Sequence, residues 1–300
     1  MNSFIEALFN PAFPFLRNAL FAGVLSSVLF GVLGAVVTVK RIAGLAGAIS
    51  HAVLGGIGMA LYLSTTKLVP WMSPIIGAVI FALLAAIIIG LVSLKAKQRE
   101  DTVINAVWAI GMSIGVLFMA KTPGYTDPTS YLFGNILLIS TRDLILLAIL
   151  DAIVVFLTWR FYPQLEASSF DDEFSRVRGI RTDLVFLILL SITAIAVVLL
   201  QTFVGIVMVI AMLTLPAGTA GYLARNLAGM MALSWLFATA FSVSGLMVGW
   251  TLDIPVGATV VVIAGAVFLG AAGARLVRTY LVKRNNQLAQ HSPAKEPRKS

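Results

Sequence analysis

The stretch AGLAGAISHAVLGGIGMALYL, residues 43–63, is long and apolar enough to cross a membrane as one helix, and it contains a histidine. This histidine and the glycines around it follow the three-and-four spacing of one helical face: Gly44, Gly47, His51, Gly55 and Gly58. A glycine inside a helix costs about 1 kcal/mol relative to alanine, so this face predicts the close approach of a neighbouring helix or a small solute. An imidazole at membrane depth normally faces protein or water, and it therefore points to a pathway.

The rest of the chain has the same membrane character. Hydrophobic residues make up 59% of the 300 residues, and charged residues make up only 11%, against roughly 25% in soluble proteins. Nine runs have membrane-spanning length and hydropathy: 16–39, 43–63, 74–94, 103–120, 144–162, 183–202, 204–223, 229–251 and 257–279. We predict an all-α polytopic membrane bundle of about nine transmembrane helices.

Basic residues gather on one side of this predicted bundle. With nine spans and the N-terminus outside, seventeen Lys and Arg residues fall on one side and four on the other. The positive-inside rule makes the basic side, including the C-terminus, cytoplasmic. Topology therefore explains the net charge of +8, and nucleic acid is not an expected partner.

The domain organisation is simple. Residues 1–282 read as one transmembrane domain, and residues 283–300 are polar and basic without apolar periodicity, which predicts a disordered cytoplasmic tail. The chain has no cysteine, so any metal ligand must be a histidine, a carboxylate, another oxygen or a methionine sulfur.

One hydrophilic connection predicts a short cytoplasmic helix at about 169–179. Ser169 is a candidate N-cap, acidic residues occupy the first turn, and Gly179 can end the helix. Its apolar residues form one stripe: Phe170, Phe174 and Val177. Such a helix either docks into a groove on a partner or lies as a connector on the membrane surface.

Other polar residues are candidates for an ion pathway. Asp151 lies near the middle of the fifth span, where a carboxylate is costly unless it is paired, hydrated or protonated. Asp253 and Asp127 lie in extracellular connections, where they either attract cations or form turns. The connection 121–143 predicts a broken or re-entrant element, or an ordered cap. Pro216 is predicted to break the seventh span, at a gate or a tight dimer contact.

Several motifs occur in order over more than 200 residues. They are Ser50-His51-Ala52, Glu100-Asp101, Gly124-Tyr125, Asp127, SYLFGNIL at 130–137, Phe174 to Gly179, Leu215-Pro216-Ala217 with Thr219-Ala220, and Asp253-Ile254-Pro255 with Gly257-Ala258. In this order and spacing, the chain resembles the permease subunit of the zinc, manganese and iron family of ABC importers.

This resemblance implies a multi-pass protein of the bacterial cytoplasmic (inner) membrane that carries a divalent metal ion. It also implies a second permease copy or a paralogue, a pair of cytoplasmic ATPase subunits, an extracytoplasmic metal-binding protein and contact with membrane lipid. The chain lacks the G-x-x-x-x-G-K-[ST] phosphate loop, so ATP hydrolysis belongs to the partner, and the permease is neither an enzyme nor a cofactor carrier.

The resemblance and the chemistry of individual residues together give the expected roles, with residues 1–282 as the permease domain; Asp151 is not part of the family pattern. The candidate metal residues are His51, Asp151, Asp127 and Asp253. The expected ATPase-coupling residues are Phe170, Phe174, Val177, Arg178 and Gly179. The residues expected to pack along the pathway are Gly47, Ser50, Gly55 and Pro216.

One departure from the family pattern bears on the metal site. Zinc and manganese members commonly place an aspartate four residues before the histidine, where this chain has Gly47. His51 would then need ligands from other spans, a second subunit or water, as at a weak transit point. The sequence leaves open zinc, manganese or iron, and a homodimer or a heterodimer.

Two other classes of function fit the sequence less well than the permease of a metal importer. A proton- or sodium-coupled secondary carrier would need several intramembrane carboxylates, and Asp151 is the one good candidate. An intramembrane hydrolase would need a nucleophile beside His51, but Ser50 lies about 100° away around the helix.

Overall fold

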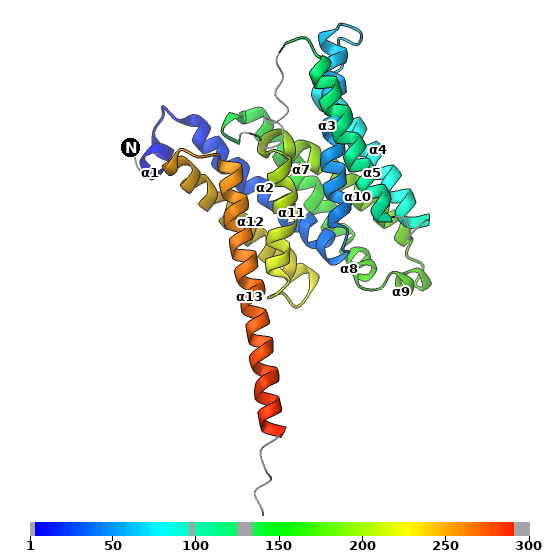
Figure 1. The fold of residues 1–300 in the computed structure, drawn as a ribbon, viewed down its shortest axis with the longest axis vertical. Coiled ribbons are helices and arrows are strands. Elements are labelled where there is room, and N and C mark those ends of the chain that lie inside the picture. The colour runs from blue at the N-terminus through cyan, green and yellow to red at the C-terminus, as the bar shows by residue number, and fades with distance from the viewer. Residues whose placement is uncertain (1–3, 96–99, 125–133, 135, 291–300) are drawn as a thin grey trace, which may run out of the picture.

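The computed structural model describes residues 4–95, 100–124, 134 and 136–290, and within these ranges the protein is helical and has no strand (Figure 1). The elements are α1 (Phe4–Phe9), α2 (Pro14–Val39), α3 (Ala43–Thr65), α4 (Pro74–Lys95), α5 (Glu100–Lys121), η2 (Ile136–Leu138), α7 (Thr141–Arg160), α8 (Tyr162–Phe170), α9 (Asp172–Val177), α10 (Thr182–Val204), α11 (Ile206–Ala220), α12 (Leu227–Leu252) and α13 (Val256–Gln290).

Each of the nine predicted segments is helical, which confirms a helical membrane bundle. Seven helices in the described ranges are long and apolar enough to span a membrane: α2, α3, α4, α5, α10, α12 and α13. The pair α7 and α8 is bent by 70°, as in a broken span, and α11 has only 15 residues. The count of nine spans and the side of the N-terminus therefore stay predictions.

Helix α3 lies in the interior of the bundle, packed between α4 and α5. In its most apolar window 72% of residues are buried, against 17% in α5 and 11% in α13. Small side chains account for this position, because they let the neighbouring backbones approach α3 closely. In Figure 1 the helices α3, α4 and α5 form one side of the molecule, and α13 projects far beyond the bundle.

The seventh predicted span is not broken where the sequence suggested. Pro216 lies inside α11 and does not end it, and the backbone break is instead at Gly205, with φ of +81°. A positive φ is favourable for glycine, so Gly205 can separate α10 from α11 without strain. Pro216 is buried, and packing against neighbouring helices supports a proline inside a membrane helix.

The prediction that a disordered tail begins at residue 283 also needs correction. Helix α13 continues to Gln290, so residues 283–290 extend a helix instead of starting a disordered tail. The first proline after α13 is Pro293, and no earlier breaker stops the helix.

The described part of the 121–143 connection packs on the bundle. Gly134, with φ of +60°, lies against the backbone of Gly205, and Ile136 in η2 is buried. Asn18 donates a hydrogen bond to the carbonyl of Ile139 at 3.4 Å. Asp127 lies outside the described residues.

Candidate functional site

The glycine stripe on α3 forms a tight seam with α5 along half of its length. A methyl group on Gly55 would lie 2.7 Å from the carbonyl oxygen of Gly111, and one on Gly58 would overlap the backbone of Gly115. On the other flank of α3, Gly56 meets the backbone of α4 in the same way. These contacts confirm that the stripe serves close helix approach in this half.

The other half of the stripe is open. Methyl groups on Gly44 and Gly47 would meet no atom within 4 Å, and Gly44 is exposed while Gly47 is half-buried. The seam therefore changes from backbone contact to open space along a single face of α3. The expected close approach of a helix is confirmed for the packed half, and the expected approach of a small solute at the open half stays a prediction.

His51 lies where the packed half of the stripe meets the open half. Its ring packs against Trp108 of α5, with centroids 5.1 Å apart and an interplanar angle of 43°. The Nδ1 atom is buried and has no hydrogen-bond partner among the residues placed in the structure. Metal-binding histidines usually have their second nitrogen held by a hydrogen bond, whereas the contact described for the His51 ring is with the indole of Trp108.

Sequence reasoning did not find Trp108. It is 44% exposed on a helix that is apolar on nearly every face, and its importance comes only from the pairing of α3 with α5. No local pattern in residues 103–120 distinguishes this tryptophan from one that faces lipid.

Among the described residues, Asp151 and Asp253 do not form a group of three metal-ligating side chains with His51. Asp151 on α7 is 6% exposed and neither carboxylate oxygen has a hydrogen-bond partner in the described ranges. Asp253 is exposed, has φ of +55° and ends α12, which fits its alternative role as a turn residue. No group of three His, Cys, Asp or Glu residues that could hold a metal ion is found in the described part of the chain.

The side chain of Ser50 is packed inside the protein. It is fully buried, and its hydroxyl donates a hydrogen bond to the carbonyl of Ala46 at 2.9 Å. This hydrogen bond stays within α3 and is a common way to satisfy a serine inside a helix. The hydroxyl is therefore turned along its own helix and is not positioned as a nucleophile beside His51.

The predicted helix at 169–179 is divided in two. Residues up to Phe170 belong to α8, and Ser169 donates its hydroxyl to Leu165 within that helix at 2.6 Å. Asp171 is the N-cap of α9 and accepts a hydrogen bond from the backbone of Phe174 at 2.9 Å. The prediction of Ser169 as the N-cap was therefore wrong. Helix α8 continues through Phe170, and Asp171, at the bend between α8 and α9, caps the free backbone N–H groups of α9 instead.

The apolar stripe of this region is uncovered. Phe170, Phe174 and Val177 are 68%, 53% and 88% exposed, and the Arg178 guanidinium lies 4.8 Å from the centre of the Phe174 ring. Gly179, with φ of +83°, follows the last turn of α9, as its position in the sequence predicted. Two exposed apolar side chains on α9 and a third at the end of α8 present a surface suited to a partner.

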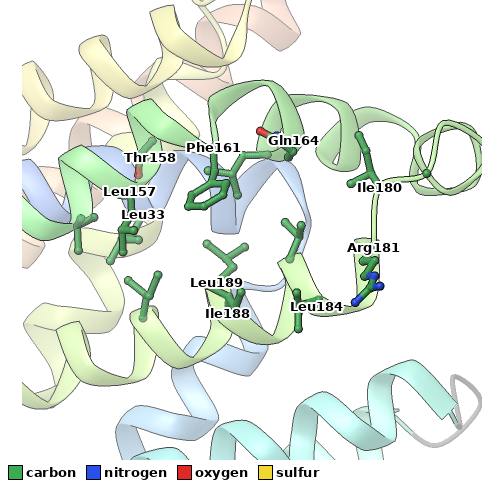
Figure 2. Close-up of a pocket in the computed structure, with 15 residues that line it drawn as sticks. Leu33, Leu157, Thr158, Phe161, Gln164, Ile180, Arg181, Leu184, Ile188 and Leu189 are labelled. Atoms are coloured by element: carbon green, nitrogen blue, oxygen red, sulfur yellow. The ribbon is translucent and has the colours of Figure 1, made fainter.

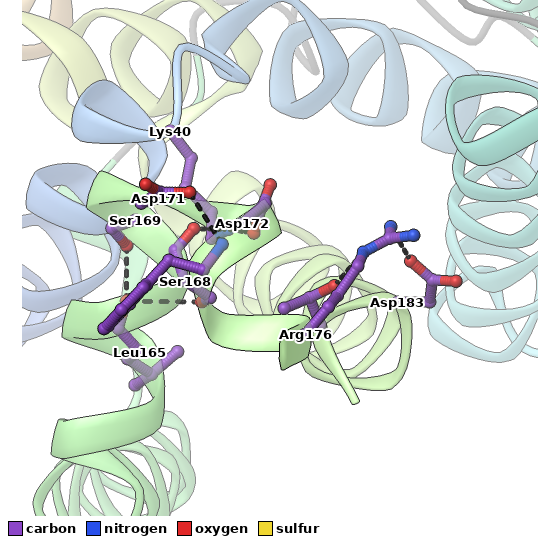
Figure 3. Close-up of polar contacts among 10 residues, drawn as sticks. Lys40, Leu165, Ser168, Ser169, Asp171, Asp172, Arg176 and Asp183 are labelled. Atoms are coloured by element: carbon purple, nitrogen blue, oxygen red, sulfur yellow. Dashed lines mark hydrogen bonds and ion pairs between the residues drawn. The ribbon is translucent and has the colours of Figure 1, made fainter. Parts of the chain in front are cut away.

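Two basic residues anchor α9 and the preceding end of α8 to the bundle (Figure 3). The Lys40 ammonium group, at the end of α2, donates to the Ser168 carbonyl at 2.7 Å and lies 3.4 Å from Asp172. Burial lowers the pKa of Lys40 below that of a free lysine, and the charge of Asp172 opposes this shift. On the other side, Arg176 donates to the Thr182 hydroxyl at 2.8 Å.

Arg176 also forms an ion pair with Asp183 in the first turn of α10. Helix α9 is therefore tied both to α2 and to α10, and a force on α9 would act on two membrane helices. Sequence analysis missed Lys40 in this role, because a lysine at the end of a span reads only as a topology signal.

Comparison with known proteins gives consistent matches over most of the chain. The model of the ABC 3 transport family matches residues 12–274. A probable metal transport system membrane protein of Chlamydia trachomatis is 34% identical over 256 residues, or 85% of this chain and 87% of that protein. The manganese transport system membrane protein MntC of Listeria monocytogenes is 31% identical over 266 residues, or 88% and 91% of the two chains.

A solved structure is also similar. PsaBC from Streptococcus pneumoniae in complex with Fab aligns with a TM-score of 0.78 and 30% identity, over 89% of this chain and 94% of that chain.

Proposed function

The chain belongs to the ABC 3 transport family, and from this premise we propose that it is the permease subunit of an ATP-driven importer of a divalent transition-metal ion. Its relatives are membrane proteins of metal transport systems, and it is a multi-pass protein of the bacterial inner membrane. Manganese is the first ion to test, because it is in the name of the Listeria relative. Zinc and iron are the competing ions.

The proposal that the metal ion passes His51 rests on the position of this residue. It is the histidine of the membrane region, and it lies where the α3–α5 seam opens beside Gly47. A neutral imidazole is a good ligand for divalent transition metals. The space beside Gly47, one turn away on the same face, is the side from which an ion would approach the ring.

A single imidazole makes a weak site. Because Gly47 supplies no carboxylate, the other ligands in this proposal are water and groups from a second permease copy facing the open half of the seam. Weak binding suits transport, since the ion must leave as readily as it enters.

In this proposal, ATP hydrolysis by the partner subunits is coupled to the permease through α9. Cytoplasmic ATPase subunits bind the exposed stripe of Phe170, Phe174 and Val177, with Arg178 and Gly179 at its end. The anchors at Lys40 and Arg176 then transmit the movement to α2 and α10. An extracytoplasmic metal-binding protein delivers the ion on the opposite side.

Substitution of His51 tests the path. We expect His51→Ala to lower uptake of radioactive Mn²⁺ at limiting concentration by about tenfold or more, the scale of losing a group that supports a metal. The matched control is His291→Ala, which removes the other histidine of the chain and should leave uptake unchanged.

Co-purification of the ATPase with His51→Ala should equal that of the unmodified chain. Normal Mn²⁺, Zn²⁺ and Fe²⁺ uptake by this variant under metal limitation would rule out His51 as part of the path. Uptake by proteoliposomes that contain the permease without the ATPase would instead favour the secondary carrier.

A further inference from the structure

A cavity of about 360 Å³ lies between α7, α8 and α10, at the end of the bundle that carries α9. We call it the α7–α10 slot, and its walls include Leu157, Phe161, Arg181, Leu184, Ile188 and Leu189. In Figure 2, Leu157 and Phe161 lie on one wall, Leu184, Ile188 and Leu189 lie on the other, and Arg181 lies at one end. Its size falls in the range of roughly 300 to 1,000 Å³ that is typical of ligand pockets.

The slot is open to the surroundings of the bundle. Phe161, Leu184 and Ile188 are 46%, 52% and 49% exposed, although they are large apolar side chains. In a protein that spans a membrane, exposed apolar walls at this depth face lipid tails and not water. Because Leu184 and Ile188 belong to the candidate spanning helix α10, we expect lipid of the bilayer to reach the slot.

The end of the slot is polar and basic. Arg181 immediately precedes α10, so its guanidinium lies where a spanning helix reaches the headgroup region. The Arg181 guanidinium has no hydrogen-bond or ion-pair partner in the described ranges, unlike that of the nearby Arg176, which pairs with Asp183. Gln164, which also lines the slot, has a buried Oε1 without a partner in the same ranges.

We propose that the α7–α10 slot binds an anionic phospholipid of the cytoplasmic leaflet, with one acyl chain between α7 and α10 and the headgroup phosphate paired with Arg181. An apolar channel that ends at an unpaired cation matches the two parts of such a lipid. Basic pockets between membrane helices on the cytoplasmic side are known to select anionic headgroups. The assignment of this leaflet rests on the proposed function, which places α9 in the cytoplasm.

The bound lipid would act on the segment that connects α9 to α10. Gly179, Ile180 and Arg181 all line the slot and form this connection. A lipid there braces the joint through which α9 is tied to α10, so anionic lipid would stabilise the docking surface without touching the ion path.

Native mass spectrometry of the purified full chain tests the proposal directly. The probes are phosphatidylglycerol and phosphatidylcholine with identical acyl chains. We expect the unmodified chain to retain phosphatidylglycerol preferentially. Arg181→Gln should lower its retention about fivefold, the effect of losing one cation beside an anionic surface, and should remove the preference. The matched control is Arg225→Gln, an exposed arginine outside the slot, which should keep the preference.

Filling the slot separates acyl-chain binding from charge attraction. Ile188→Trp should lower retention of both lipids, whereas Ile195→Trp, two turns along α10 and outside the slot, should lower neither. Leu184→Phe serves as a second filling variant if Ile188→Trp does not elute from gel filtration as folded protein.

Three results would overturn the proposal: equal retention of the two lipids by the unmodified chain, equal losses for Arg181→Gln and Arg225→Gln, or undiminished retention in both filling variants. Because lipid retention is measured without metal, ATP or ATPase, it can fail while metal uptake is normal, and the proposed transport can fail while lipid retention persists.

Discussion

Gly47 and Gly58 lie on the same face of α3, yet replacing each with alanine should change stability in opposite directions. A methyl group at Gly47 meets nothing within 4 Å, whereas one at Gly58 overlaps the backbone of Gly115 on α5. The two substitutions have the same chemistry and differ only in what lies across the seam.

The magnitudes follow from these surroundings. Alanine is favoured over glycine inside a helix by about 1 kcal/mol, and Gly47→Ala should gain that amount. Gly58→Ala gains the same helix preference, but overpacking against another backbone costs about 3 kcal/mol, because a backbone cannot rotate away as a side chain can. The net expectation is a loss of about 2 kcal/mol.

Thermal unfolding of the purified chain in detergent, followed by circular dichroism, measures both effects. With a shift of roughly 2 °C per kcal/mol for a chain of this size, Gly47→Ala should raise Tm by about 2 °C and Gly58→Ala should lower it by about 4 °C. Shifts of the same sign in both variants would refute the division of the stripe into packed and open halves.

Two further predictions concern α9. Lys40→Met should lower the free energy of unfolding by about 2 kcal/mol, since it removes a charged hydrogen bond to Ser168, and should raise the ATP hydrolysed per transported ion in proteoliposomes that contain the ATPase. Asp172→Asn removes only the exposed ion pair with Lys40 and should cost less than about 1 kcal/mol. An unchanged ratio of ATP hydrolysed to ion transported in Lys40→Met would contradict the anchoring role of Lys40. Phe174→Ser should reduce co-purification of the ATPase about tenfold or more, as expected for an aromatic interface anchor, while Phe9→Ser, which removes an even more exposed ring from α1, should not; equal losses would argue against docking on α9.

Local pattern predicted much of the molecule, including the helical segments, the glycine face of α3 and the end of α9 at Gly179. The prediction failed where two nearby residues could each have the same structural role. Ser169 and Asp171 are both good caps, and the bend between α8 and α9 selected Asp171. Pro216 reads as a break, but tertiary packing keeps α11 continuous and Gly205 takes the break instead.

By itself the sequence determined that this chain lies in a membrane, how its apolar segments are divided, and that His51 lies on a face able to admit another backbone or an ion. Only the tertiary structure decided which half of that face is closed by α5, that Trp108 packs against the imidazole, and that Lys40 and Arg176 tie α9 to two different helices. The physical reason is range: hydropathy and periodicity act between residues a few positions apart. Contacts between α3 and α5, or between α2 and α9, depend instead on how whole helices pack.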